Sequence, residues 1–377
     1  MPKQRNEKML DVVDMKGVGV APRISRRTRL AFTLVELLVV IVIIAILAAL
    51  IVPAIAAARR TAFQVAIKAE IAGVETAIET YKNDVGGSYP PDSGVGQGAL
   101  AGVAQQRFRD FKRHLKKAFP QHRESDELIA GLVGADASGT PSASGSNANF
   151  GGMTPAEACV FWLQRFSSDP RYPISGPGGP AFYFDTSAPA NGEELAGRNW
   201  IIDYREERFG PRNDANAFAG RAYSYTEPFD FNGNGDTDDE LRINLWTYTP
   251  ASSTQPLVYF DASRGLHDTT HAALGFEAYP LKQLRAGATV NGTPLVNQLR
   301  LANEGKFQVL HCGGDGEWGD FGALHLPAIA PGGDTAVNAE NPDGNVILLY
   351  PDGPFTDELA DTVANFGEES SIEDARQ

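Results

Sequence analysis

The sequence predicts an α+β protein in which one long N-terminal α-helix precedes a loop-rich body of short strands and extra helices. Three observations predict this class. Residues 37–58 form an uncharged apolar run of 22 residues, a helical stripe of apolar residues follows it, and short β-prone runs between turn residues fill the C-terminal half. The 39 Gly and 24 Pro residues exceed the usual combined share of about 12%, which excludes a compact helical bundle.

The charge is distributed unevenly along the chain. The 377 residues carry a net charge of −14, but residues 1–31 hold eight Lys/Arg and three acidic residues and are therefore positive. A basic leader before an acidic body indicates membrane topology, and the acidic body argues against general nucleic-acid binding. The two cysteines exclude a disulfide-dense scaffold and a four-cysteine zinc site.

The apolar run is long enough to cross a membrane. As a helix, residues 37–58 would extend about 33 Å, against a hydrocarbon core of about 30 Å. The arginines that precede the run would keep the N-terminus in the cytoplasm and send the body across, although two arginines also follow it. These residues are Arg26, Arg27 and Arg29 before the run, and Arg59 and Arg60 after it.

A cleaved secretory signal and a plain single-pass anchor are two alternative interpretations of this segment. A secretory signal has an apolar region of about 7–15 residues, shorter than this run, although Ala56–Ala58 imitates a small-residue cleavage site. A plain anchor would not be expected to carry Glu36 just inside the apolar stretch, because a carboxylate in hydrocarbon is costly. In both alternatives, Glu36 would simply extend its carboxylate towards the interface.

The block RLAFTLVELL at residues 29–38 resembles the processing site of type IV pilins and type II secretion pseudopilins. The resemblance implies cleavage between Ala31 and Phe32, N-methylation of Phe32, and a fifth-residue role for Glu36 in assembly. The family nearly always has Gly where this chain has Ala31. The new amine of Phe32 would neutralise Glu36 of a neighbouring subunit or of its own chain. The resemblance also extends to Pro53, which would bend or locally unwind the helix.

An amphipathic pattern continues the apolar run, so we expect one helix from Phe32 to about Asn83, ended by residues 84–87 and spanning the membrane to about residue 58. Its apolar stripe comprises Phe63, Ile67, Ile71, Val74, Ile78 and Tyr81. The expected organisation is therefore a cleaved leader at 1–31, the helix at 32–84, a globular body at 85–370 and an acidic, frayed tail at 371–377.

Three later stretches also resemble the family, and specifically its major pseudopilins. Residues 81–91 resemble the junction that follows the long helix in the family. Residues 307–317 resemble a strand that leads into a Gly-rich loop containing an aspartate. Residues 361–366 resemble the family's closing strand. The resemblance implies that the long helix packs on a small antiparallel sheet. The intervening residues match no part of the family.

The middle of the chain predicts helices and then strands. We expect one basic amphipathic helix within residues 100–131, with Phe108, Phe111, Leu115 and Phe119 inward, and a flexible loop at 132–153. Thr154-Pro155-Ala156-Glu157 has the form of a capping box, and the helix that follows would bury Cys159, Trp162, Leu163 and Phe166. Strands are predicted at 181–184, 200–204, 241–248, 256–260 and 346–350.

Residues 230–240 resemble the first part of an EF-hand calcium loop. Oxygen-bearing side chains recur at every second position, which suits the hard Ca²⁺ ion, but Leu241 stands where that loop needs a bidentate Glu. Glu240 would have to replace it, and an acidic turn without metal is the alternative. The candidate ligands are Asp230, Asn232, Asn234, Asp236, Asp238 and Glu240, and Asp315 and Asp343 are weaker candidates for a second site.

Other potentially reactive residues suggest no catalytic site. His267 and His271 are four apart, but Asp268 stands where a zinc-protease helix needs Glu, and a loop without metal is the simpler interpretation. Cys159 and Cys312 would form either one disulfide or two buried thiols. The sequence lacks nucleophile-elbow and phosphate-loop motifs, and we expect a protein that is not an enzyme.

Together these features predict a structural subunit of a type II secretion pseudopilus or a type IV pilus-like filament. Its expected location is the bacterial inner membrane, with the body in the periplasm, and then a filament in the periplasm or at the cell surface. Its expected partners are copies of itself, other pilins or pseudopilins, the prepilin peptidase and the inner-membrane assembly platform. The alternative is a low-copy or tip module that binds a ligand in a calcium-dependent manner and uses the pilin segment for export.

Overall fold

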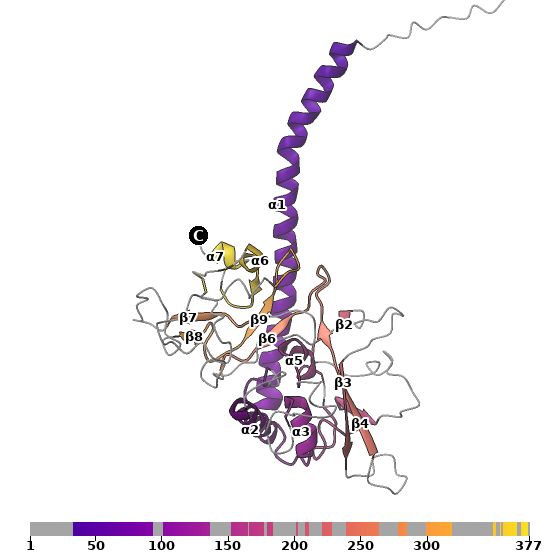
Figure 1. Ribbon diagram of the computed structural model, residues 1–377, viewed down its shortest axis with the longest axis vertical. Coiled ribbons are helices and arrows are strands. Elements are labelled where there is room, and N and C mark those ends of the chain that lie inside the picture. Colours follow the sequence, from indigo (N-terminus) through magenta and orange to yellow (C-terminus); the bar gives the residue numbers. More distant parts are fainter. Residues whose placement is uncertain are drawn as a thin grey trace, which may run out of the picture. The chain divides into compact units, whose positions relative to one another are not determined.

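A computed structural model confirms the α+β class (Figure 1). It describes residues 33–92, 101–135, 152–164, 166–176, 179–183, 201–202, 208–210, 221–227, 239–263, 278–284, 299–318, 350–351, 355, 357–367 and 371–375. The chain divides into two units, Met1–Ala56 and Ala57–Gln377, which are described separately below. The helices are α1 (Leu34–Tyr81), α2 (Ala101–Ala118), α3 (Asp126–Val133), α5 (Pro155–Phe161), α6 (Asp357–Ala360) and α7 (Ile372–Ala375).

The 48-residue helix α1 confirms the predicted long helix. A π-helical turn, Lys82–Gly86, follows it, and Gly87 then adopts a left-handed conformation with φ 57°, which ends the helix as a Gly C-cap does. Within the second unit, one stripe of α1 is fully buried, as the spacing predicted, while Phe63 is half-buried. The fully buried members of the stripe are Ile67, Ile71, Val74, Ile78 and Tyr81.

The strands of the second unit are short and form small antiparallel sheets, with orders β1-β4-β3, β10-β9-β6, β2-β5 and β7-β8. Their bounds are β1 Ala181–Tyr183, β2 Phe209–Gly210, β3 Arg221–Glu227, β4 Asp239–Leu245, β5 Thr247–Tyr248, β6 Val258–Phe260, β7 Lys282–Leu284, β8 Leu299–Leu301, β9 Gln308–His311 and β10 Val363–Ala364. The predicted closing strand is confirmed, because β10 pairs with β9.

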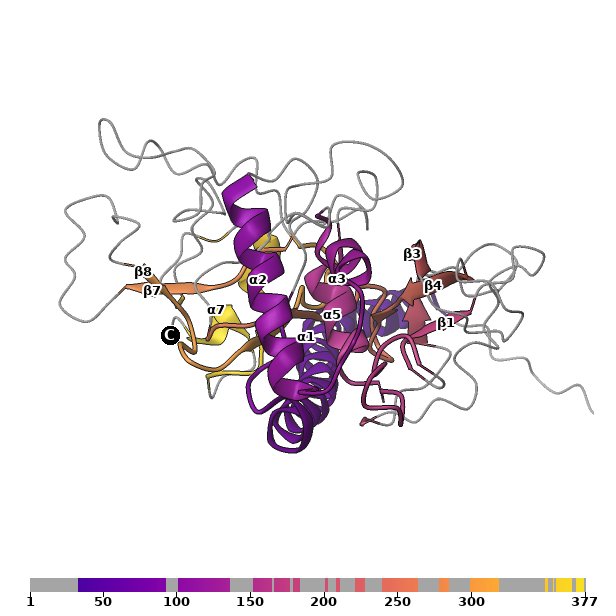
Figure 2. The same cartoon turned by 90° about the horizontal axis from the view of Figure 1, so that it is seen from below.

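The main core of the second unit lies between the buried stripe of α1 and the helices α2, α3 and α5, which gather beside it (Figure 1 and Figure 2). Trp162 is fully buried at its centre, stacks edge-on against Tyr81 and donates its indole N–H to the carbonyl of Pro91 at 2.8 Å. The Tyr81 hydroxyl in turn lies 2.8 Å from Nε2 of the buried His114. The end of α1 is thus held to α2 and to the segment that leaves α1.

The structure differs from the sequence prediction in the middle of the chain. The single helix predicted at 100–131 is two helices, because α2 ends at Ala118 just before Pro120 and a new N-cap, Ser125, starts α3. The inward positions of Phe108, Phe111 and Leu115 are confirmed. The loop predicted at 132–153 begins later than expected, since residues 132–133 belong to α3, and residues 136–151 lie outside the described residues.

Further differences concern strands and the tail. Of the strand predicted at 200–204, residues 201–202 are described and form a bend. Of the strand predicted at 346–350, Tyr350 is described and lies in a turn. The other residues of both predicted strands lie outside the described residues. Strands β2, β3, β7 and β8 were not predicted from the sequence. The tail, which we expected to be frayed, forms α7 and buries Ile372 in a second apolar cluster around β6, β9 and β10.

Candidate functional site

Thr33 and Glu36 form a capping box at the start of α1. The Glu36 carboxylate Oε2 accepts hydrogen bonds from the Thr33 backbone N–H and from the Thr33 hydroxyl, both at 2.9 Å. The Glu36 N–H donates to the Thr33 hydroxyl at 3.2 Å. Both side chains are exposed, so these bonds satisfy local donors and leave the carboxylate charge without a cation among the described residues.

The part of α1 that follows is apolar on every side. Its large aliphatic side chains are exposed from Leu34 to Ile55, at fractions between 44% and 79%. Among the described residues, α1 and its π-helical extension are long and apolar enough to cross a membrane. Pro53 lies inside this helix, where its missing N–H removes one backbone hydrogen bond. This segment has no partner for its apolar surface within its own unit, as expected of a helix that enters a bilayer or a helix bundle.

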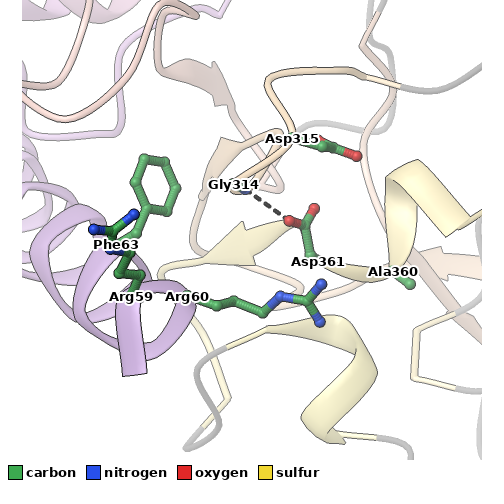
Figure 3. A pocket seen from close by; sticks show the side chains of 7 residues that line it. All are labelled: Arg59, Arg60, Phe63, Gly314, Asp315, Ala360 and Asp361. Carbon is green, nitrogen blue, oxygen red and sulfur yellow. Dashed lines mark hydrogen bonds between the residues drawn. The ribbon is translucent and has the colours of Figure 1, made fainter. Parts of the chain in front are cut away.

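A cavity of about 620 Å³ lies in the second unit, beside the first residues of α1 that belong to that unit (Figure 3). The Asp361 carboxylate accepts the Gly314 N–H at 2.7 Å, and Arg60 extends towards Asp361 (Figure 3). Burial raises the pKa of Asp361 above the usual range of an aspartate. The cavity is lined by Arg59, Arg60, Phe63, Gly314, Asp315, Ala360 and Asp361.

His311, the last residue of strand β9, is fully buried next to this cavity. It lies between Phe63 of α1 and the loop that begins at Gly313. Its Nδ1 accepts the Gly313 N–H at 3.0 Å, so the proton of the neutral ring lies on Nε2, 2.8 Å from the Ser253 hydroxyl. Burial lowers the pKa of His311 to about 4, so the ring is neutral at pH 7. Because His311 Nε2 carries the proton, it cannot act as a base towards Ser253, and the pair is structural.

The sequence did not predict this cavity. In the sequence, Arg59 and Arg60 bear on membrane topology, Asp315 is a weaker metal candidate, and Asp361 belongs to the predicted closing strand. Their grouping depends on the β9–β10 pairing, which joins segments about fifty residues apart and brings both beside residues 59–63 of α1. No local spacing could have revealed it.

The other predicted site residues are only partly described. Ala31, Phe32, His267 and His271 lie outside the described residues. So do the candidate calcium ligands from Asp230 to Asp238, while Glu240 lies in β4. The described residues contain no group of three or more metal-ligating side chains. Strands β3 and β4 pair directly on either side of residues 228–238, so the candidate calcium loop connects the two strands of a hairpin.

Cys159 and Cys312 are thiols and form no disulfide in this structure, which decides between the two alternatives that the sequence left open. Cys159 lies in the main core and Cys312 in the second apolar cluster. Both are buried, and burial raises the pKa of Cys312 well above that of an exposed thiol.

Comparison with known proteins identifies the N-terminal segment. A family model of the prokaryotic N-terminal methylation motif matches residues 26–52, which include Ala31, Phe32 and Glu36. The match supports a type IV pilin-like protein that is processed by prepilin peptidase. Neither the curated proteins nor the solved structures contain a match to this chain.

Proposed function

We propose that the protein is a structural subunit of a pilus-like filament, and that it assembles through its N-terminal helix. The observation that carries this proposal is the methylation motif at residues 26–52, at the start of a helix whose first part is apolar all round. The second part of the same helix forms one wall of the core of the body. A single element therefore links a segment built for lateral packing to a folded body.

Glu36 is the residue on which assembly depends in this proposal. Cleavage between Ala31 and Phe32 creates a new amine four residues before Glu36. The capping box already satisfies hydrogen bonds of the Glu36 carboxylate locally, but a hydrogen bond from Thr33 does not neutralise its charge. An unpaired charge in apolar surroundings is costly. Pairing of the Glu36 carboxylate with an amine removes this cost and therefore stabilises subunits that pack in register.

Among pilus-like filaments, we favour a type II secretion pseudopilus. The features that support this choice are those that carried the resemblance to major pseudopilins. They are the junction after α1, the Gly-rich loop after β9 and the short closing strand β10, which pairs with β9 in the structure. Co-purification from cross-linked membranes tests the choice, because secretion-system or pilus-assembly components would be recovered with the chain.

Mass spectrometry of the mature chain tests the processing step directly. The full chain is produced in cells with and without a prepilin peptidase, and its intact mass is measured. We expect a chain that begins with N-methylated Phe32 only when the peptidase is present. An Ala31→Gly variant, which restores the family's usual residue, should be processed at least as fast, whereas a bulky, charged Ala31→Lys variant should keep its leader. An intact leader on the unmodified chain would contradict the proposal.

We also propose that residues 230–240 bind Ca²⁺. Support comes from the alternating oxygen ligands in the sequence and from the hairpin that holds the ends of the loop together. The register pairs Glu227 with Asp239, so the backbone ends of the loop lie opposite each other.

A thermal shift of the full chain tests the calcium site. Millimolar Ca²⁺ should raise the melting temperature by several degrees above its value in EGTA, because a ligand that binds only the folded state stabilises that state. Mg²⁺ at the same concentration should act less, and Asp230→Ala should remove the Ca²⁺ effect. An equal melting temperature in Ca²⁺ and EGTA would exclude the site.

A further inference from the structure

Four charged side chains line the cavity beside residues 59–63 of α1, and their formal charges cancel. Arg59 and Arg60 contribute two positive charges, and Asp315 and Asp361 contribute two negative charges. Within the described part of the chain, none of the four takes part in an ion pair. Opposite charges that share a cavity of about 620 Å³ without pairing leave room for a ligand that carries both signs.

The hydrogen-bonding groups around the cavity are also only partly used. Asp361 accepts the Gly314 N–H through Oδ2, while its buried Oδ1 accepts no hydrogen bond from any described residue. Asp315 is exposed and accepts one N–H, from Glu317, through Oδ1. Arg59 and Arg60 are exposed, and neither side chain donates a hydrogen bond to another described residue. A buried carboxylate oxygen without a donor is costly, and a ligand N–H would remove that cost.

The position of the two arginines in the chain indicates where such a ligand comes from. Arg59 and Arg60 directly follow the uncharged run 37–58, whose helical length of about 33 Å matches the hydrocarbon core of a bilayer. Residues that follow a spanning run lie at the level of the phospholipid head groups, where arginines meet lipid phosphates. The half-buried ring of Phe63 adds an apolar wall to the same cavity.

We propose that this cavity binds the phosphoethanolamine head group of a membrane phospholipid. The phosphate oxygens accept hydrogen bonds from Arg59 and Arg60, and the primary ammonium donates to the carboxylates of Asp315 and Asp361. Because the cavity is neutral overall, an anionic phosphatidylglycerol would leave both carboxylates without a cation. A phosphatidylcholine head group has no N–H to donate. The proposal rests on the membrane-spanning part of the proposed function.

Native mass spectrometry of the detergent-solubilised full chain tests this site. The chain is mixed with equal amounts of phosphatidylethanolamine, phosphatidylglycerol and phosphatidylcholine, and the retained lipids are compared. We expect phosphatidylethanolamine to exceed each of the others by about tenfold, the effect of one additional charge-assisted hydrogen bond. The double variant Arg59→Gln/Arg60→Gln should bind the three lipids about equally. Asp315→Asn, which keeps the Oδ1 acceptor for Glu317, should shift the preference towards phosphatidylglycerol.

Matched arginines elsewhere on the body provide the control. Arg109 and Arg123 are also exposed, and neither takes part in a side-chain ion pair with the described residues, so Arg109→Gln/Arg123→Gln removes the same charge without touching the cavity. This variant should keep the preference. Equal binding of the three lipids by the unmodified chain, or the same loss in the control, would overturn the proposal. An unchanged preference in Asp315→Asn would also overturn it.

Two further measurements separate the possible sources and the possible failures. Excess soluble phosphoethanolamine should displace only part of the bound phosphatidylethanolamine, and complete displacement would assign the site to the free compound instead of the lipid. The same spectra report whether the chain begins at Phe32. A processed chain without lipid preference contradicts the head-group site alone, whereas an unprocessed chain that retains the preference contradicts only the proposed processing.

Discussion

Two capping boxes of almost the same geometry occur in this chain, one exposed and one buried. At the start of α1, Glu36 Oε2 accepts from Thr33 N and Oγ1 at 2.9 Å each, and Glu36 N donates to Thr33 Oγ1 at 3.2 Å. At the start of α5, Glu157 Oε2 accepts from Thr154 N and Oγ1 at 2.9 Å each, and Glu157 N donates to Thr154 Oγ1 at 3.3 Å. The local hydrogen bonds therefore do not distinguish them.

The surroundings of the two capping boxes, in contrast, differ. Glu157 is fully buried in the folded body, so its hydrogen bonds are needed for the stability of the body. Glu36 is exposed at the edge of an apolar helix surface, so its hydrogen bonds organise the helix start while its charge stays open to a partner. The same four-residue motif therefore stabilises the fold in one place, and in the other it leaves a charge open to the assembly contact that we propose.

The largest expected effect distinguishes charge from capping at the exposed box. Glu36→Gln keeps an acceptor oxygen for Thr33 but removes the negative charge. If the charge drives assembly, filament mass per cell should fall by at least about tenfold. Pairing a charge in apolar surroundings changes the equilibrium constant of assembly by more than about tenfold. Electron microscopy of sheared filaments, with chain abundance measured by immunoblot, checks this. Full assembly of the variant would end the assigned role of Glu36.

The next largest effect is expected from the burial of His311, which makes the stability of the body depend on pH. His311 has a folded pKa of about 4, below its unfolded value of 6.5, because burial disfavours the charged ring. The unfolded chain therefore binds the proton first as pH falls. Stability should drop by roughly 3 kcal/mol between pH 6.5 and 4. Denaturant unfolding of the full chain in detergent across this range measures the loss. A His311→Gln variant should show a correspondingly smaller pH dependence, and an equally steep one would contradict this assignment.

A smaller effect is expected from deleting the hydroxyl of each box. Thr154→Ala should destabilise the body by about 1 kcal/mol, the usual cost of losing an N-cap. Thr33→Ala, the matched change in the other unit, should leave the unfolding midpoint of the body unchanged. Denaturant titrations of the two variants side by side check the comparison, which fails if both variants shift the midpoint equally.

The smallest effect is expected at the surface. The Arg171–Asp169 pair has N–O separations near 2.8 Å, but the arginine side chain is 56% exposed. Arg171→Gln should therefore leave the free energy of unfolding nearly unchanged, and added salt should reduce any change further. A loss as large as that of Thr154→Ala would show that exposure does not separate these groups.

The sequence predicted much of the helical structure because local rules govern it. The spacing of Ile67, Ile71 and Val74 gave the buried face of α1, and the order Thr154-Pro155-Ala156-Glu157 gave the start of α5. The division between α2 and α3 could also have been predicted locally, because Pro120 and the N-cap Ser125 mark it.

The cavity beside residues 59–63 of α1 could not be predicted in this way. Its carboxylates come from the turn after β9 and from the residues just before β10, and only tertiary pairing brings them to Arg59 and Arg60. Short strands such as β2 and β7 were missed for a related reason. Two or three residues show no periodicity, and a partner strand rather than propensity fixes their conformation.

The two buried thiols give this chain a built-in reporter of opening. Cys159 and Cys312 lie in separate apolar clusters, and neither is accessible to a reagent while its cluster is closed. The rate at which a maleimide modifies each cysteine therefore counts how often the corresponding part of the body opens. Peptide mapping would then follow both openings in intact cells, without an introduced label.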